Sequence, residues 1–403
     1  MGAHEVLEKE FIIEIKMANV LVFGGGLQAI SVCRSLKEHH NVVLAAKHDK
    51  IARRSNFIDE YINLKNDSDP EIVIDELLSI VSSKSIDIVI PMEDAQASSL
   101  SQCKQKLETS GVKCAVMDWE VFSLVSDKTK FLEFCNNNDL PHPKTQSFDI
   151  NDESIRHAAK QVGFPSLIKP SHSEGAKGIT LVNNMEELLE KGSVVIKEFG
   201  DCALQEYIAS KDYYYNVMIY RGQDGSWGNH CIIKILRYYP IGGGSSSLCV
   251  TVENDKILDI CKKALEKIDW KGFADFDVLE KEDGDYRIIE INPRVPASLR
   301  AAAVSGINYP EMIVSDLLKG EYDTYQYQTG KYLRYLGLDI AWFLASTKRW
   351  KCKPSWFKFF GTDIYYQEGG KKDMSAMWTS MIEGIKKQLN PSFRKQKSGL
   401  NIK

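Results

Sequence analysis

The chain has 403 residues and a formal net charge of −4, with 43% hydrophobic and 26% charged residues, a composition typical of a globular protein with two or three domains. The sequence lacks an 18-residue apolar run and a charged-then-apolar leader, which argues against a membrane span and a signal peptide. Its nine cysteines form no C-x-x-C pair, so we expect neither a zinc site nor a disulfide framework and predict a cytoplasmic protein.

The first part of the chain predicts a strand–helix–strand unit. Residues 1–16 precede a second methionine, Met17, and are either an extension or the result of an earlier start codon. The apolar run "NVLVFGGG" (19–26) ends in glycines, a helical spacing follows over 27–40, and "NVVLAA" (41–46) is a second apolar run.

The glycines of this unit fit the dinucleotide fingerprint G-x-G-x-x-G/A at Gly24, Gly26 and Ala29. Such glycines let the backbone and a helix N-terminus approach an anion. The fingerprint also needs an acid at the end of the second strand, where this sequence has Lys47 and only later Asp49. A nicotinamide site therefore stays open as an alternative.

Two later segments carry polar residues at places where ligands bind. The buried run "IDIVIPMEDA" (86–95) ends in acids at the carboxyl edge of a predicted strand, so Glu93 is a candidate substrate contact, with helix capping as the alternative. A helix is predicted to begin at Ser126 or Asp127 with Lys128 in its first turn. Because a lysine there opposes the helix dipole, it suggests a nearby anion.

A new lobe is predicted to begin at "NDLPHPKT" (138–145), whose two prolines indicate a loop. Within it, "FPSLIKP" is an apolar strand with one ligand-facing lysine, Lys169. The loop from Ser171 to Gly178, which includes Gly175, can present backbone N–H groups to phosphate oxygens, or it is a plain hairpin connection.

The next segments suit a nucleotide. "LQEYI" (204–208) can offer a backbone N–H and C=O to an adenine edge, and Asp212 can accept ribose hydroxyls. Further along, Arg237 precedes a Gly/Ser-rich loop that suits an anion.

The segment "GFADFDVLEKEDGDYRIIEINPR" (272–294) predicts a hairpin that turns at Asp283 and Gly284. A symmetric hairpin makes Asp277 and Glu290 cross-strand neighbours. Two opposed carboxylates repel each other unless a cation lies between them, so the pair suggests a metal site.

Alternation along the second strand of the hairpin predicts two chemically different faces. Glu290, Asn292 and Arg294 share one face, and the other face carries Ile289, Ile291 and Val295. Because Pro293 cannot donate to a ladder, the strand must end there or lie at a sheet edge. Glu290 and Asn292 offer oxygen ligands for Mg²⁺, with Arg294 beside them for an anion.

Positive charge is concentrated near the C-terminus. Residues 346–403 contain thirteen Lys/Arg and four Asp/Glu, a net charge of +9 that leaves −13 for the rest. "STKRWKCKPSWFKFF" adds aromatic residues to the bases, which is compatible with a membrane surface, an acidic partner or an anionic substrate. The alternative is an ordinary subdomain with solvated lysines.

The ordered series Lys128, Lys169 with its glycine loop, "LQEYI", Asp277 and "EINPR" resembles the ATP-grasp superfamily of carboxylate-amine ligases, especially the carbamoyl-phosphate synthetase and D-aspartate ligase branch. The resemblance extends from about Asn19 to Leu318. It implies a mixed α/β and α+β fold. We expect a Rossmann-like domain over 17–124, two ATP-grasp lobes over 125–195 and 196–325, and a C-terminal region over 326–403.

The resemblance also implies roles for the residues. Phosphates would be bound by Lys128 and Lys169 under a closing loop that contains Ser171, Gly175 and Gly178. Adenine would lie on Gln205, Glu206, Tyr207 and Ile208, and ribose on Asp212. One or two Mg²⁺ ions, or Mn²⁺, would bind Asp277, Glu290 and Asn292, while Arg294 and Arg237 stabilise the transferred phosphoryl group. Gly24 to Gly26 and Glu93 would line the carboxylate site.

The implied reaction is ATP-dependent amide or peptide bond formation through an acyl-phosphate, with release of ADP and phosphate. We expect small-molecule carboxylate and amine substrates, no nucleic-acid partner, and a homodimer as the default assembly. A nicotinamide-dependent oxidoreductase and a non-catalytic nucleotide-binding protein remain as alternatives.

Overall fold

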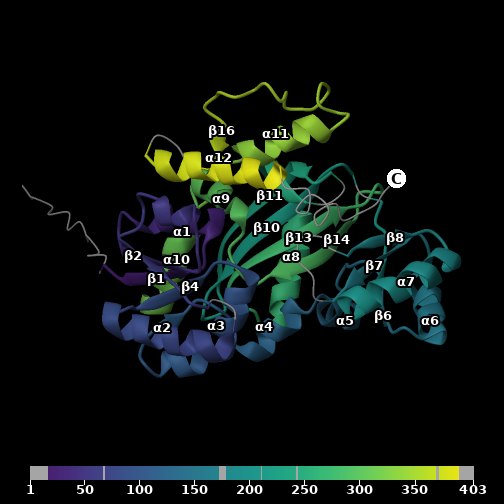
Figure 1. Ribbon diagram of the computed structural model, residues 1–403, viewed down its shortest axis with the longest axis horizontal. Coiled ribbons are helices and arrows are strands. Elements are labelled where there is room, and N and C mark those ends of the chain that lie inside the picture. Colours follow the sequence, from purple (N-terminus) through teal and green to yellow (C-terminus); the bar gives the residue numbers. More distant parts are fainter. Residues whose placement is uncertain are drawn as a thin grey trace, which may run out of the picture.

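The computed structural model describes residues 17–66, 69–171, 178–209, 211–241, 244–368 and 372–389, which form three sheets with helices around them (Figure 1). The first sheet is parallel throughout, in the order β3-β2-β1-β4-β5. Its strands are β1 (Asn19–Phe23), β2 (Asn41–Ala46), β3 (Glu60–Asn63), β4 (Ile88–Pro91) and β5 (Lys113–Cys114). Its helices are α1 (Gly26–Leu36), α2 (Pro70–Lys84), α3 (Asp94–Glu108) and α4 (Trp119–Ser126). The predicted α/β character is confirmed, because β1, β2 and β4 are buried on both faces.

A smaller antiparallel sheet follows, in the order β6-β9-β7-β8. It is built from β6 (Thr145–Phe148), β7 (Ser166–Pro170), β8 (Thr180–Val182) and β9 (Cys202–Glu206). Helices α6 (Asp152–Val162) and α7 (Met185–Phe199) pack against it around a core of their own, and α5 (Lys128–Asn137) precedes it. β9 belongs to this sheet although it lies after the predicted boundary at residue 195.

The third sheet has seven strands, in the order β14-β13-β10-β11-β12-β15-β16. The strands are β10 (Tyr214–Arg221), β11 (Trp227–Tyr239), β12 (Ser245–Val252), β13 (Gly272–Glu280), β14 (Tyr286–Asn292), β15 (Tyr332–Arg334) and β16 (Ile364–Tyr366). Helices α8 (Asp255–Ile268), α9 (Arg300–Val304), α10 (Tyr309–Lys319), α11 (Leu336–Ala345) and α12 (Met374–Leu389) complete this part. β15 and β16 come from the basic C-terminal region and extend the sheet.

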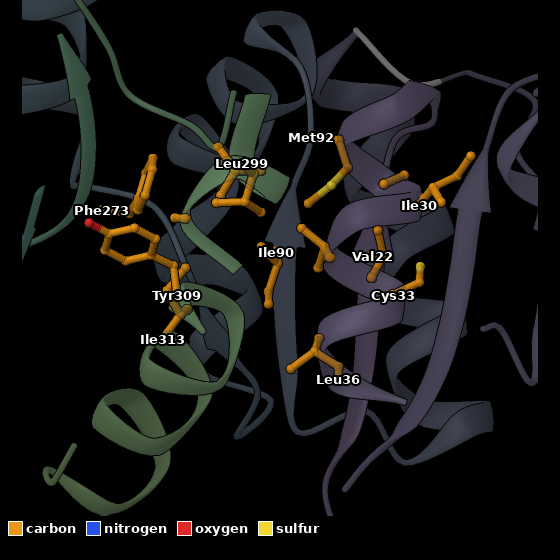
Figure 2. Packing of buried hydrophobic residues seen from close by; sticks show 14 of the residues in the cluster. Val22, Ile30, Cys33, Leu36, Ile90, Met92, Phe273, Leu299, Tyr309 and Ile313 are labelled. Atoms are coloured by element: carbon orange, nitrogen blue, oxygen red, sulfur yellow. The ribbon is translucent and has the colours of Figure 1, made fainter. Parts of the chain in front are cut away.

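The first domain and the seven-stranded sheet share one hydrophobic core. Figure 2 shows Val22, Ile90 and Met92 of the first domain facing Phe273 and Tyr309 across the boundary. All but Phe273 are at most 2% exposed. Burying side chains of this size stabilises a fold by about 1.5–3 kcal/mol each, so this shared core holds the two parts together.

The hairpin β13–β14 has the predicted register where the polar residues lie. Asp277 faces Glu290, but Val278 pairs with Ile288, so β14 contains a bulge at Ile289. The bulge shifts the alternation of the strand. Ile288 is therefore fully buried while Ile289 is partly exposed, and the prediction that Ile289 shares the core face with Ile291 is wrong.

The end of the strand agrees with the sequence reasoning. β14 is an edge strand, and it ends at the residue before Pro293. All nine cysteines lie in the described ranges and are free thiols. Within the same ranges, no helix combines the length and apolar character that crossing a lipid bilayer requires.

Candidate active site

Polar side chains from three neighbouring strands meet on one face of the seven-stranded sheet. In the ladder, Asp277 of β13 lies opposite Glu290 of β14 on one side and Asn216 of β10 on the other. Asn216 Nδ2 donates a short hydrogen bond to Asp277 Oδ1. Two residues earlier on β13, Asp275 faces Asn292, whose Nδ2 lies 3.4 Å from Asp275 Oδ2. The backbone register alone therefore brings three carboxyl groups together.

Two lysines approach this cluster from α5 and β7. Asp127 caps α5 by accepting from Thr129 N and Lys130 N, so the helix begins at Lys128 rather than at the predicted Ser126 or Asp127. Lys128 lies in the first turn, as predicted. Lys128 Nζ lies 2.7 Å from Glu290 Oε2, and the charge of Glu290 raises the pKa of Lys128. Lys169 lies on β7. Burial and the positive charge of Lys128 lower its pKa to about 8.

An arginine closes the cluster on the side of the first domain. Arg294 Nε donates to Asp94 Oδ1 at 2.9 Å, and its Nη2 lies 3.4 Å from both Asp94 Oδ2 and Asn292 Oδ1. Asp94 is the first residue of α3, directly after β4. The ion pair therefore ties the hairpin to the carboxyl edge of the parallel sheet, where ligands bind in such folds.

The carboxyl groups differ in their electrostatics. Burial opposes ionisation of Glu290, but the charge and hydrogen bond of Lys128 lower its pKa to about 2. Burial and the charge of Glu290 raise the pKa of Asp277 well above its ordinary value. Burial raises the pKa of Asp275 to about 8, against the charge of Arg294. Lys128 therefore favours the charged form of Glu290, whereas burial favours the protonated forms of Asp275 and Asp277.

The donor atoms fit a magnesium ion that also binds phosphate. Mg²⁺ commonly takes one or two carboxylates from the protein and completes its octahedron with water and phosphate oxygens. Asp277, Glu290 and Asn292 offer such oxygens, and Asp275 Oδ1 is buried with no hydrogen-bond partner among the described residues. Among the residues that the structure describes, no group of three or more His, Cys, Asp or Glu side chains is arranged to hold a metal ion. Asp277, Glu290 and Asn292 fit a magnesium ion whose remaining ligands come from water and phosphate.

The proposed adenine segment lies at the end of β9. Gln205 is buried, and its Nε2 donates to Thr145 Oγ1 at 3.1 Å. The amides of Glu206 and Tyr207 donate to carbonyl oxygens of Lys144 and Pro165 at 2.8 and 3.2 Å. Because these two N–H groups are already used, a backbone donor to adenine must come from another residue of the segment, such as Ile208.

The ends of the glycine loop are held near the lysines. Ser171 Oγ lies 3.2 Å from Thr129 Oγ1 in the first turn of α5. At the other end, Gly178 has φ +78°, and a Cβ there would lie 2.8 Å from Pro170 Cγ, so only glycine fits. Residues 172–177, which include the predicted Gly175, lie outside the described residues.

Two predicted site residues have partners in the C-terminal region instead. Arg237 is 3% exposed, and its Nε lies 2.9 Å from Asp339 Oδ1. Its other contacts are Cys352 Sγ and the carbonyl of Pro354. Asp212 forms a largely exposed ion pair with Lys348. The structure does not bring either residue into the cluster around Glu290, and their roles toward ATP remain predictions.

The N-terminal glycine loop already holds an anion of the protein itself. Gly26 N donates to Asp49 Oδ2 at 2.9 Å, and a Cβ on Gly25 would lie 2.2 Å from that oxygen. Asp49 thus occupies the position that a dinucleotide phosphate would take at the N-terminus of α1. This arrangement argues against the nicotinamide alternative. Glu93 is the N-cap residue of α3, but its side chain makes no capping hydrogen bond.

Three residues of the cluster were missed by the sequence reasoning. Asp275 carried a signal, because it lies two residues before Asp277 and must share its face. Asn216 was visible only as a polar residue inside an apolar strand. Asp94 was passed over for its neighbour Glu93, since the sequence does not show which acid faces Arg294.

Comparisons with known proteins agree with the resemblance carried by the motifs. Residues 125–298 match the family model of the ATP-grasp domain. The chain is 26% identical over 322 residues to D-aspartate ligase of Enterococcus faecium, covering 73% of this chain and 76% of that protein. It is also 24% identical over 256 residues to the carbamoyl phosphate synthase large chain of Methanobrevibacter smithii. That match covers 60% of this chain and 23% of the other protein.

A solved structure shows the same fold. The biotin carboxylase domain of Hydrogenobacter thermophilus 2-oxoglutarate carboxylase, crystallised as a dimer with MgADP, ADP and bicarbonate, matches with a TM-score of 0.63. The identity is 19%, and the match covers 78% of this chain and 73% of the other.

Proposed function

We propose that this ATP-grasp ligase joins a carboxylate to an amine through an acyl-phosphate, with release of ADP and phosphate. The observation that carries the proposal is the cross-strand pair Asp277 and Glu290, which lies against Lys128 and Lys169. A partly buried carboxyl pair facing two cations is an unfavourable arrangement for stability alone, and it suits the binding of a metal–polyphosphate.

The reaction requires that charge be neutralised. A carboxylate oxygen attacks the γ-phosphorus while the bond from that phosphorus to the bridging oxygen breaks, and both reactants are anions. Lys128 and Lys169 bind phosphate oxygens from the small-sheet side, and Arg294, which follows the end of β14, lies near Asn292 and Glu290. Asp277, Glu290 and Asn292 would hold Mg²⁺, which would supply further positive charge at the phosphate oxygens. In the second step the amine nitrogen attacks the acyl carbon, phosphate leaves and the nitrogen loses a proton.

The carboxylate substrate binds near Arg294 in this proposal. Its guanidinium lies between Asn292 and Asp94, at the junction of β14 with the loop after β4. An arginine fixed by a bidentate partner presents its remaining donors in a constant direction. One of the two substrates is an amino acid, by analogy with the name of the Enterococcus faecium relative. The free thiols favour a reducing compartment, so we place the enzyme in the cytoplasm.

ADP release in the presence of amino acids and small carboxylates tests the proposal. We expect release that needs one carboxylate and one amine together, and a Lys128→Met variant that binds ADP·Mg more weakly and releases little ADP. Release that ignores the amine would refute the ligase assignment. NADH fluorescence enhancement without ATP binding would favour the oxidoreductase instead.

A further inference from the structure

The segment that joins α11 to β16 carries an unusual surface. Residues 346–362, here called the basic-aromatic loop, contain five Lys/Arg and no Asp or Glu. The loop extends beyond the edge of the seven-stranded sheet and projects from the body of the protein (Figure 1).

Buried arginines fix the backbone of this loop. Arg334 donates from Nη2 to the carbonyl of Trp356 at 2.9 Å and from Nη1 to that of Lys358 at 3.3 Å. Arg237 reaches the carbonyl of Pro354 at 3.4 Å. Asp339 is fully buried between the two arginines, at 2.6 and 2.9 Å. The loop is therefore held in one conformation by interactions beneath it.

On this fixed backbone, apolar rings point into solvent. Phe360 is 90% exposed, Trp350 73% and Phe357 56%. The rings of Trp350 and Phe357 stack on each other at 5.9 Å between centroids, and Phe343 of α11 packs against Trp350 at 5.3 Å. Large apolar groups held outward by a rigid scaffold indicate a binding surface, because folding alone buries such groups.

Positive charge surrounds the rings. Lys351 and Lys353 are exposed and form no ion pair within the described residues. Lys348 and Lys358 pair with Asp212 and Asp363 at the margins of the loop. The loop therefore presents a net positive charge together with a tryptophan and two phenylalanines.

We propose that the basic-aromatic loop docks the protein on the surface of an anionic lipid bilayer. Trp350, Phe357 and Phe360 enter the headgroup region, where aromatic rings are favoured, while Lys351 and Lys353 contact lipid phosphates. An acidic protein or a nucleic acid would satisfy the lysines but has no general place for three projecting apolar rings. The proposal is independent of the reaction that the active site catalyses.

Co-sedimentation of the full chain with lipid vesicles tests this. We expect binding to phosphatidylcholine vesicles that contain phosphatidylglycerol, weak binding to pure phosphatidylcholine, and a loss with added salt. The triple variant W350S, F357S, F360S should lose binding by about tenfold or more. The double variant K351E, K353E should lose about tenfold or more on anionic vesicles only.

Control variants change exposed residues outside the basic-aromatic loop. Trp119→Ser removes an exposed tryptophan of α4, and K113E with K319E makes the same charge change on exposed lysines elsewhere. These controls should bind vesicles like the wild type, and all variants should keep ADP·Mg affinity, which shows that they are folded. Equal binding by the triple variant and the wild type would overturn the proposal. So would wild-type binding to an acidic protein or nucleic acid without binding to anionic vesicles.

Discussion

Replacing Glu290 by glutamine removes one charge from the centre of the proposed site and almost nothing else. Glu290 is separated from Lys128 Nζ by 2.7 Å, a distance at which two unit charges attract by about 6 kcal/mol at an effective dielectric constant of 20. Burial opposes the ionisation of Glu290, but the attraction to Lys128 is larger. The net result is that the pKa of Glu290 is lowered from 4.5 to about 2. That difference corresponds to about 3–4 kcal/mol in favour of the charged form.

If the charge acts on bound metal and phosphate, its loss should raise the reaction barrier by a similar amount. We therefore expect Glu290→Gln to lower Mg²⁺-dependent turnover by about 10²–10³-fold. The fold should survive, because the Glu290 side chain is 20% exposed and the amide oxygen of a glutamine can still accept a hydrogen bond from Lys128. Calorimetric titration of ADP with and without Mg²⁺ measures the effect before the substrates are known, since the variant should lose the affinity that the metal adds.

Glu311→Gln is a suitable control. Glu311 also pairs with a basic residue, His40 at 3.0 Å, and its side chain is 22% exposed against 20% for Glu290. It lies on α10, away from the cluster, and its variant should bind ADP·Mg like the wild type. Metal-dependent ADP affinity that survives in Glu290→Gln would remove Glu290 from the metal site.

Three further predictions follow from the electrostatics. Burial lowers the pKa of Lys169 to about 8, so the affinity for ADP should fall as the pH rises through 8. In a titration of ADP binding against pH, the Lys169→Arg variant should show no such fall, because arginine stays charged. Burial raises the pKa of Asp275 to about 8 and the pKa of Asp277 above its ordinary value, so binding of ADP·Mg to their ionised forms should release protons. Calorimetry in buffers of different ionisation enthalpy measures this release, and its absence would contradict the ligand set. The Asp339→Asn variant leaves two buried arginines without a counterion, so urea unfolding should show a free energy of unfolding lower by about 3–5 kcal/mol. As a control, Asp363→Asn removes a more exposed ion pair and should change the free energy of unfolding by about 1 kcal/mol or less.

The local pattern predicted the hairpin because its determinants are local. The turn "EDGD", the alternation along β14 and the break at Pro293 together placed Asp277 opposite Glu290, and the structure has that pairing. The bulge at Ile289 was not predictable in this way, because a bulge depends on how the sheet twists against its neighbours. The bulge leaves the pairs Asp277–Glu290 and Asp275–Asn292 in the predicted register. It shifts by one residue only the pairs between Val278 and the turn.

Long-range partners were the part that the sequence could not supply. Arg237 was predicted to bind an anion of the substrate. The strand that carries it lies beside α11, however, and Arg237 forms an ion pair with Asp339 of that helix. The C-terminal region had no recognisable pattern because β15 and β16 are three residues each and gain stability only by pairing with β12 and each other. Such short strands leave little periodicity in a sequence.

The ion pair between Lys128 and Glu290 bears on how ATP would bind. The sequence suggested an anion near the lysine in the first turn of α5, and in the structure Glu290 lies there. A nucleotide phosphate that binds Lys128 has to replace Glu290, which is then free to bind a cation. Phosphate and metal therefore depend on each other, since either one alone breaks the ion pair and leaves a buried charge without a partner. In the proposed mode of binding, full separation of Lys128 from Glu290 would therefore require both components of MgATP.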